Sequence, residues 1–325
     1  MTTQEKTTFK TAFEEEVYEG LTAFPKHLSS KFFYDKKGDK LFQEIMALPE
    51  YYLTDCEYTI INENKSKFAR LFNAELGFDL IELGAGDGKK TKLLLEHFMQ
   101  YKVNFSYKPI DISADVLAEL NESVTKTWPD LDIQTQQGTY VEVLENISQF
   151  NKRKKIIMLL GSNIGNLTHG QAVDFLKNIQ EAMNNGDILF MGLDQKKSPD
   201  RILSAYKDSK GVTEAFNKNL LTRINRELDA DFDIEAFLHW PTYNPETGTT
   251  KSFLVSKKEQ KVHINRLNLD VNFEAWESIH TEISQKYDDN VVNWLAQEAG
   301  LQVIDQFTDE NGYFKDYLFE KIIGE

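Results

Sequence analysis

Apolar positions follow two alternating periods between residues 57 and 196. Short apolar runs with strand-like spacing come first, and each is followed by a segment with apolar residues three and four positions apart, the spacing of an amphipathic helix. The predicted strands are "FDLIELG", "FSYKPIDIS", "LDIQTQQG", "KKIIMLLGS" and "GDILFMGLD". The predicted helices between them are "KKTKLLLEHFMQ", "ADVLAELNESVTKTW" and "GQAVDFLKNIQEAMNNG". This alternation is typical of an α/β fold with a doubly wound parallel sheet.

The pattern changes after residue 196. A helical run, "PDRILSAYKDSKGVTEAFNKNLLTRINREL", is followed by β-rich text, "TKSFLVSKKEQKVHINRLNLDVNF", in which "KKEQ" predicts a hairpin turn. The tail returns to helix, strand, turn and strand, which can complete the first sheet. We therefore predict a Rossmann-like domain over 56–196 and 287–325. A second, smaller α+β substrate-binding domain is expected from the N-terminal arm, 1–55, and the insertion, 197–286.

Charge and composition narrow the possible partners. The chain has 52 acidic and 37 basic residues among 325, a net charge of -15 that disfavours nucleic acid and anionic membranes as partners. The longest apolar run, "IIMLL", is far shorter than a membrane span, so we expect a cytoplasmic protein. One cysteine excludes an internal disulfide, and the six histidines lack close ligand spacing, so no metal site is expected. Protein partners are not predicted by this pattern.

The loop "IELGAGDGKKT" suggests a nucleotide-like ligand. A phosphate-binding P-loop needs four residues between its glycines and Ser or Thr after its lysine, and neither condition is met. A dinucleotide GxGxxG needs glycine where Lys89 stands. What remains is GxGxG after an acid, Glu82, with a second acid, Asp111, ending the next strand. This pattern is typical of class I S-adenosylmethionine-dependent methyltransferases, where such an acid accepts both ribose hydroxyls. A glycine turn without a ligand, with Asp111 as a helix N-cap, remains the alternative.

The segment after the fourth strand, "LLGSNIGNL", lacks the Asn or Asp followed by Pro-Pro and an aromatic residue that amino-methylating DNA enzymes carry at this place. Several long motifs instead resemble one family, the L-histidine Nα-methyltransferases of ergothioneine biosynthesis. They are "KFFYDKKGDKLFQEIMALPEYYLT", "LLGSNIGNL", "AYKDSKGVTEAFNKN", "NRELDADFDIEAF" and "TEISQKY". They occur in the same order and span almost the whole chain.

The resemblance implies roles for particular residues. On the substrate side, Tyr34 would stand near the amine that receives the methyl group, and the implied histidine-binding residues are Tyr51 and the pair Glu282 and Ser284 for the imidazole, with Asn166 and Tyr206 for the carboxylate. On the cofactor side the implied residues for S-adenosylmethionine are Gly84, Gly86, Lys90 and Asp111, with Thr139 and Tyr140 flanking the adenine. Glu282 and Ser284 stand two apart, so in a strand they share one face.

Each of these residues also has a purely structural interpretation. Tyr34, Tyr51 and Tyr206 fit a core, Asn166 fits a turn, and Glu282 with Ser284 fits the solvent face of a strand. Two positions depart from the family: Thr139 replaces an acid that many members carry, and Ser252 aligns approximately with a pocket methionine.

The sequence predicts conversion of L-histidine to Nα,Nα,Nα-trimethylhistidine by successive methyl transfers. The alternatives are methylation of an imidazole nitrogen or of another small amine or amino acid, and a non-catalytic protein that binds S-adenosylmethionine or histidine.

Overall fold

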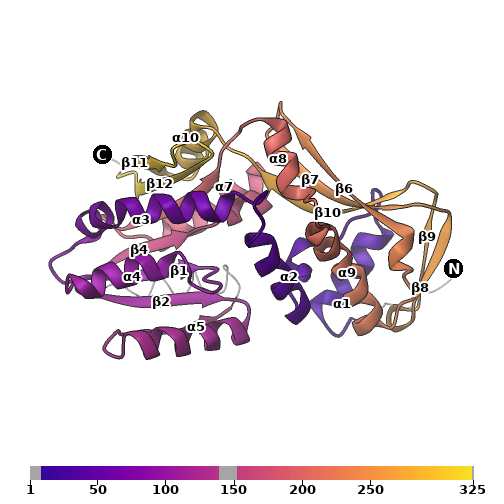
Figure 1. The fold of residues 1–325 in the computed structure, drawn as a ribbon, viewed down its shortest axis with the longest axis horizontal. Helices are drawn as coiled ribbons and strands as arrows, with labels where there is room; N and C mark the ends of the chain where they lie inside the picture. Colours follow the sequence, from indigo (N-terminus) through magenta and orange to yellow (C-terminus); the bar gives the residue numbers. More distant parts are fainter. Residues whose placement is uncertain (1–8, 139–151, 324–325) are drawn as a thin grey trace. The chain divides into compact units, whose positions relative to one another are not determined.

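The computed structural model describes residues 9–138 and 152–323, which form two compact units (Figure 1). We call residues 53–196 and 285–325 the sheet unit, and residues 1–52 and 197–284 the insertion unit. The first boundary falls slightly before the predicted one because helix α3 (Leu53–Phe72) is continuous through residue 56. No helix in the described ranges is long and apolar enough to cross a bilayer.

The sheet unit contains a seven-stranded sheet with the strand order β11-β12-β5-β4-β1-β2-β3. Its strands are β1 (Phe78–Leu83), β2 (Phe105–Asp111), β3 (Gln136–Gln137), β4 (Lys154–Leu159), β5 (Ile188–Asp194), β11 (Leu301–Thr308) and β12 (Phe314–Lys321). The first five are parallel, as predicted, and β12 pairs antiparallel with both β5 and β11. The prediction that the C-terminal tail completes this sheet is therefore confirmed.

Buried apolar strands explain why helices flank this sheet. All residues of β1 and β5 are buried, which is the pattern of strands covered on both faces. The helices in the described part of the unit are α3, α4 (Thr91–Gln100), α5 (Ala114–Thr127), α7 (His169–Ala182) and α10 (Asp289–Glu298). Ile179 of α7 and Leu295 of α10 belong to one apolar cluster with Leu159 and Leu189 of the sheet. The carboxyl ends of β1 and β2 carry the described cofactor candidates, and the loop after β4 carries the substrate candidate Asn166.

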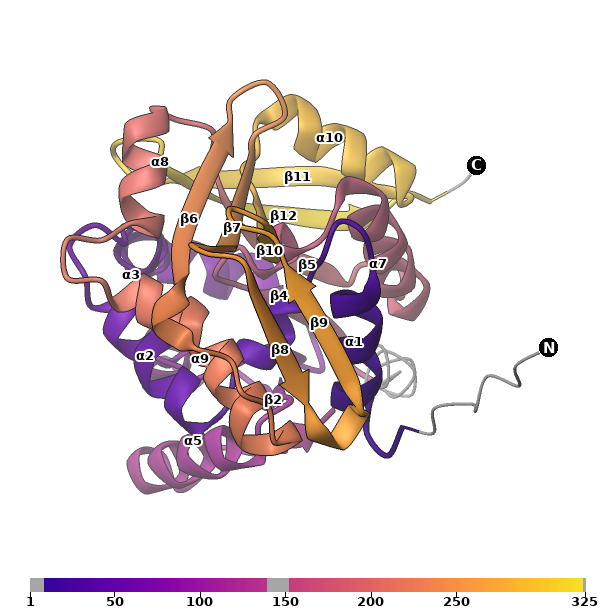
Figure 2. The ribbon, with the colours of Figure 1, turned by 90° about the vertical axis from the view of Figure 1, so that its right-hand side faces the viewer.

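The insertion unit combines an N-terminal helical arm with short antiparallel sheets. Its helices are α1 (Ala12–Thr22), α2 (Lys36–Met46), α8 (Pro199–Tyr206) and α9 (Val212–Leu228), with single turns η1 (Ser30–Phe33), η3 (Ile234–Ala236) and η4 (Asn265–Leu267). Its strands are β6 (Phe237–Asn244), β7 (Thr249–Ser256), β8 (Gln260–Ile264), β9 (Leu269–Phe273) and β10 (Ser278–Gln285). They form a sheet ordered β10-β7-β6 and a separate β8-β9 hairpin (Figure 2).

The prediction of a hairpin at "KKEQ" is wrong. Strands β7 and β8, which flank it, belong to different sheets, and the hairpins are β6-β7 and β8-β9. The end of β7 is already paired, because the Ser256 N–H donates to the Glu277 carbonyl and the Ser256 carbonyl accepts from Trp276. The segment therefore leads out of one sheet and into the next.

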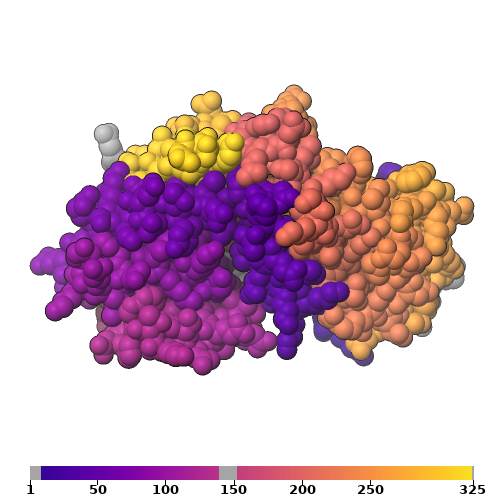
Figure 3. Space-filling model, viewed as in Figure 1, coloured from indigo at the N-terminus to yellow at the C-terminus, as the bar shows by residue number. Residues whose placement is uncertain are grey.

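A shared apolar core joins the arm to the insertion. Val17 of α1, Ile45 of α2, Leu220 of α9 and Leu254 of β7 belong to one buried cluster. Helix α2 packs on α9, and the indigo N-terminal residues border the salmon and orange residues of the insertion in the space-filling view (Figure 3). Two segments far apart in the sequence thus form one folding unit.

Candidate functional site

The glycine loop is shaped by backbone angles that favour glycine. Strand β1 ends at Leu83, and Gly84 and Gly86 follow with φ of 73° and 55°. The Gly84 N–H donates to the Ile110 carbonyl at 2.8 Å, which ties the loop to the end of β2. A Cβ placed on Gly86 would meet no heavy atom within 4 Å, so this backbone is open to an approaching molecule.

Asp111 joins this loop to the carboxyl end of β2. One carboxylate oxygen accepts from the Gly86 N–H at 3.1 Å, and the other accepts from the Ser113 N–H at 3.0 Å. The alternative role of Asp111 as the N-cap of the next helix is wrong, because the Ser113 hydroxyl caps α5 by accepting from Val116. The structure thus brings Gly84, Gly86 and Asp111 together at adjacent strand ends, where ligands bind in open α/β sheets.

Glu82, the acid that precedes the glycines, connects several elements around the loop. Glu82 is 3% exposed, and its carboxyl group accepts from the hydroxyls of Thr91 and Tyr107. Burial raises the pKa of Glu82 to about 7, and the two hydroxyls and the positive charge of Lys90 act against this rise. Glu82 therefore joins β1, β2 and the start of α4.

The raised pKa of Glu82 predicts a pH-dependent stability. The folded protein binds the Glu82 proton more tightly than the unfolded chain does, so this contribution is complete below pH 4.5 and is lost as the pH rises through about 7. In wild type the free energy of unfolding should fall across this window, and Glu82→Gln should make that fall smaller by up to ~3 kcal/mol. Urea unfolding at several pH values measures this, with Glu96→Gln on the exposed side of α4 as the control. Equal slopes for Glu82→Gln and wild type would contradict the assignment.

Lys90 stands directly before α4 and forms an ion pair with Glu57 of α3. The Glu57 carboxylate also accepts from the Gly161 N–H, with 2.9 Å to each oxygen. Glu57 was not among the residues singled out by the sequence, because it lies far from the glycine loop inside an ordinary amphipathic helix. The predicted adenine-flanking residues Thr139 and Tyr140 lie outside the described residues.

Asn166 ends the single turn η2 (Asn163–Asn166) in the loop after β4, and its side chain is exposed. The preceding Gly165 packs closely on backbone from another part of the sheet unit: a Cβ there would lie 3.1 Å from the Gln285 carbonyl oxygen. This contact fixes the turn that presents Asn166.

Two predicted substrate residues belong to one aromatic cluster in the insertion unit. The rings of Tyr34 and Tyr51 both contact Phe42, at centroid distances of 5.6 Å and 6.3 Å. Tyr34 also contacts Phe216 of α9 at 5.7 Å. Tyr34 is 37% exposed, so its ring is anchored while part of the side chain reaches the surface.

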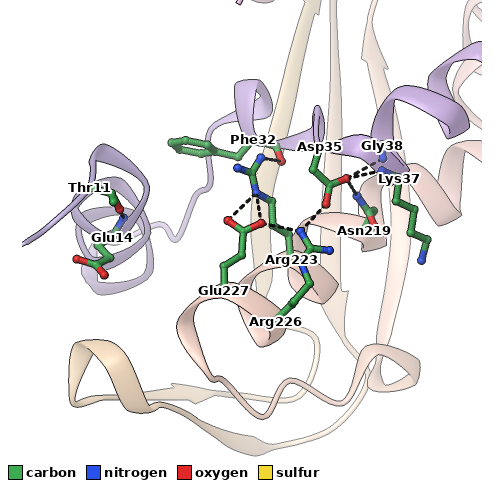
Figure 4. A network of polar contacts seen from close by, with 10 residues as sticks. All are labelled: Thr11, Glu14, Phe32, Asp35, Lys37, Gly38, Asn219, Arg223, Arg226 and Glu227. Atoms are coloured by element: carbon green, nitrogen blue, oxygen red, sulfur yellow. Dashed lines mark hydrogen bonds and ion pairs between the residues drawn. The ribbon is translucent and has the colours of Figure 1, made fainter. Parts of the chain in front are cut away.

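A polar network fixes the backbone next to Tyr34 (Figure 4). The Asp35 carboxylate caps α2 by accepting from the N–H groups of Lys37 and Gly38, and it also accepts from Asn219 and Arg226 of α9. Burial alone would raise the pKa of Asp35, but the hydrogen bonds from Gly38, Arg226 and Asn219 lower it overall. Asp35 therefore stays ionised and holds the arm on α9.

Glu282 and Ser284, the residues predicted to bind the imidazole, lie two positions apart in β10. Glu282 accepts a hydrogen bond from the hydroxyl of Ser252, in the neighbouring strand β7, at 3.0 Å. Ser284 and Tyr206 are buried, at 7% and 8% exposure, and Tyr206 is the last residue of α8. The Ser252 hydroxyl thus orients the Glu282 carboxylate. Within the described ranges, no group of His, Cys, Asp and Glu side chains fits a metal ion.

Comparison with known proteins places this chain in a family. The model of the S-adenosylmethionine-dependent, histidine-specific methyltransferases matches residues 13–321, which include segments of both units. The chain belongs to this family. It is 38% identical to the histidine N-alpha-methyltransferase of Mycolicibacterium smegmatis and 37% identical to that of Mycobacterium tuberculosis, each over 93% of both chains. It is also 27% identical to an L-tryptophan methyltransferase of Psilocybe serbica, over 92% of this chain and 90% of that one.

Membership confirms the predicted fold class, methyltransferase activity and cofactor. The protein is an enzyme with a class I methyltransferase sheet, and its cofactor is S-adenosylmethionine. The assignments of individual site residues stay predictions.

Proposed function

We propose that this enzyme transfers methyl groups from S-adenosylmethionine to the α-amino nitrogen of L-histidine, successively to the trimethylated product. The observation that carries the proposal is the match to histidine N-alpha-methyltransferases along both units, together with a carboxylate, Glu282, held in β10 by Ser252. A carboxylate is a suitable acceptor for an imidazole N–H.

The residues at the glycine loop fit the cofactor. The open backbone at Gly86 allows close approach, and Asp111 is a suitable acceptor for the ribose hydroxyls. Lys90 supplies a positive charge for the carboxylate of the cofactor's amino-acid end. The bound cofactor supplies an activated methyl group on its sulfonium sulfur.

The protein's own contribution is mainly alignment. An α-amine with a pKa of roughly 8 to 9 needs little help to lose its proton at neutral pH, so a strong base is not required. We propose that Tyr34 stands beside this amine, where its anchored ring restricts the amine's approach. Tyr51, Glu282 and Ser284 would hold the imidazole. Asn166 and Tyr206 would hold the carboxylate as neutral hydrogen-bond donors.

The similarity to an L-tryptophan methyltransferase supports a second candidate, an aromatic amino acid as acceptor. The pair Glu282 and Ser284 disfavours it, because an indole ring presents one N–H donor, whereas imidazole presents a ring nitrogen to each of the two side chains. Mass spectrometry of histidine and tryptophan incubated with enzyme and cofactor tests both. We expect histidine to gain three methyl increments, all located at the α-nitrogen by fragmentation. Methylation on the ring, or faster methylation of tryptophan, would contradict the proposal.

The proposed carboxylate contacts predict discrimination between histidine and histamine. Histamine keeps the ring and the amine but has no carboxylate for Asn166 and Tyr206. Each lost hydrogen bond to a charged group costs about 1.5 to 3 kcal/mol, so kcat/KM for histamine should be lower by at least about tenfold. Steady-state kinetics with both amines measures this. Comparable values would remove the two residues from the substrate site.

A further inference from the structure

Three ionisable side chains of the sheet unit meet at the carboxyl ends of its central strands. Glu57 comes from α3, Lys90 precedes α4, and Asp316 lies in β12 opposite Gly192 of β5. The Glu57 side chain is 0% exposed, whereas the Lys90 side chain is 21% exposed. The ammonium therefore lies between a buried carboxylate and the surface of the unit.

Glu57 contacts both loops that border the cofactor end of the sheet. It pairs with the Lys90 ammonium and accepts from the Gly161 N–H, directly beyond β4. A Cβ on Gly161 would lie 3.3 Å from the Lys90 nitrogen, so the turn and the lysine are closely packed. An ammonium has three donors, so pairing with Glu57 leaves others for a second acceptor.

Asp316 is a second buried carboxyl group, next to Glu57. It is 0% exposed, and no protein donor in the described ranges reaches either of its oxygens. Burial, and then the negative charge of Glu57, raise the pKa of Asp316 well above its usual range. The carboxyl groups of Asp316 and Glu57 are neighbours, and a hydrogen bond between them requires that one of them carries a proton. A side chain at Gly192 would collide with Glu57 and crowd Asp316, which explains glycine in this strand.

We propose that Glu57 is a positioning residue for cofactor binding, with Asp316 as its proton-bearing support. Glu57 holds the Lys90 ammonium and the Gly161 turn so that the remaining donors of Lys90 meet the α-carboxylate of S-adenosylmethionine. With Asp316 neutral, the cluster carries no net charge and does not repel that carboxylate. The inference rests on the proposed cofactor role of Lys90.

Calorimetric titration of the full-length protein with S-adenosylmethionine, without histidine, tests this. Glu57→Gln should weaken binding about tenfold, Lys90→Met by at least as much, and the double variant little more than Lys90→Met alone, because Glu57 acts through Lys90. Asp316→Asn should stay within about threefold of wild type, since its amide donates to Glu57 as a protonated acid does. Glu63→Gln, exposed on α3, is the matched control, and thermal unfolding checks that each variant is folded.

The outcomes separate the possible errors. Unchanged or tighter binding by a folded Glu57→Gln variant, or additive losses with Lys90→Met, would overturn the positioning role. A loss in Asp316→Asn as large as that in Glu57→Gln would overturn the proton assignment. Unchanged binding by Lys90→Met would instead refute the proposed cofactor role of Lys90.

Discussion

Glu282→Ala should lower kcat/KM for histidine by about ten- to two-hundredfold, equivalent to the 1.5 to 3 kcal/mol of a hydrogen bond to a charged group. The variant loses the proposed acceptor for the imidazole N–H, while the glycine loop and Asp111 are untouched. Cofactor affinity should therefore stay the same. An amine without a ring N–H donor should be affected little, and tryptophan should be accepted better because the pocket becomes larger and less polar.

Two further variants sharpen this measurement. Ser252→Ala removes the hydroxyl that orients Glu282. It should therefore cost about 0.5 to 1.5 kcal/mol of transition-state binding with histidine, and nothing with acceptors that Glu282 does not contact. Glu274→Ala changes an exposed acid shortly before β10 and should have no effect. If a folded Glu282→Ala variant had kcat/KM lowered by equal factors for histidine and for acceptors without an imidazole, Glu282 would not be the residue that recognises the imidazole.

Asp111→Ala should weaken S-adenosylmethionine binding by roughly 1.5 to 3 kcal/mol. The carboxylate that would accept the ribose hydroxyls is lost, and the Gly86 N–H loses its partner in the loop. Calorimetry measures the affinity, and Asp115→Ala, exposed in the first turn of α5, is the control. Unchanged affinity in a folded Asp111→Ala variant would remove Asp111 from the cofactor site.

The sequence predicted the sheet unit well because its strands and helices carry distinct periodicities. Fully buried runs such as those of β1 and β5 have few alternatives to central parallel strands. Strand pairing in the insertion unit was harder to predict. The "KKEQ" segment has the composition of a turn, but composition does not show that the end of β7 pairs with the chain before β10.

The candidate site shows the same division. The glycine loop follows β1 and Asp111 ends β2, which are adjacent parallel strands, so their proximity follows from the predicted strand order. Glu57 and Asp316 come from a helix and from the last strand, and local periodicity contains no information about their meeting. Asp35 likewise looks like a simple helix cap in the sequence, while its contacts with Asn219 and Arg226 depend on packing between distant segments.

Neither unit is one continuous stretch of chain, and this affects how the protein is synthesised. The arm up to residue 52 leaves the ribosome long before α9 and β7, whose residues belong to the same apolar cluster. Strand β12, which separates β5 from β11, is the last strand of this sheet to be synthesised. A product that stops at residue 196 would leave β5 as an open sheet edge and the arm without its core. Such edges recruit strands from other molecules. Truncated chains should therefore aggregate instead of retaining one working half, and an isolated insertion unit would require residues 1–52 to be joined directly to 197–284.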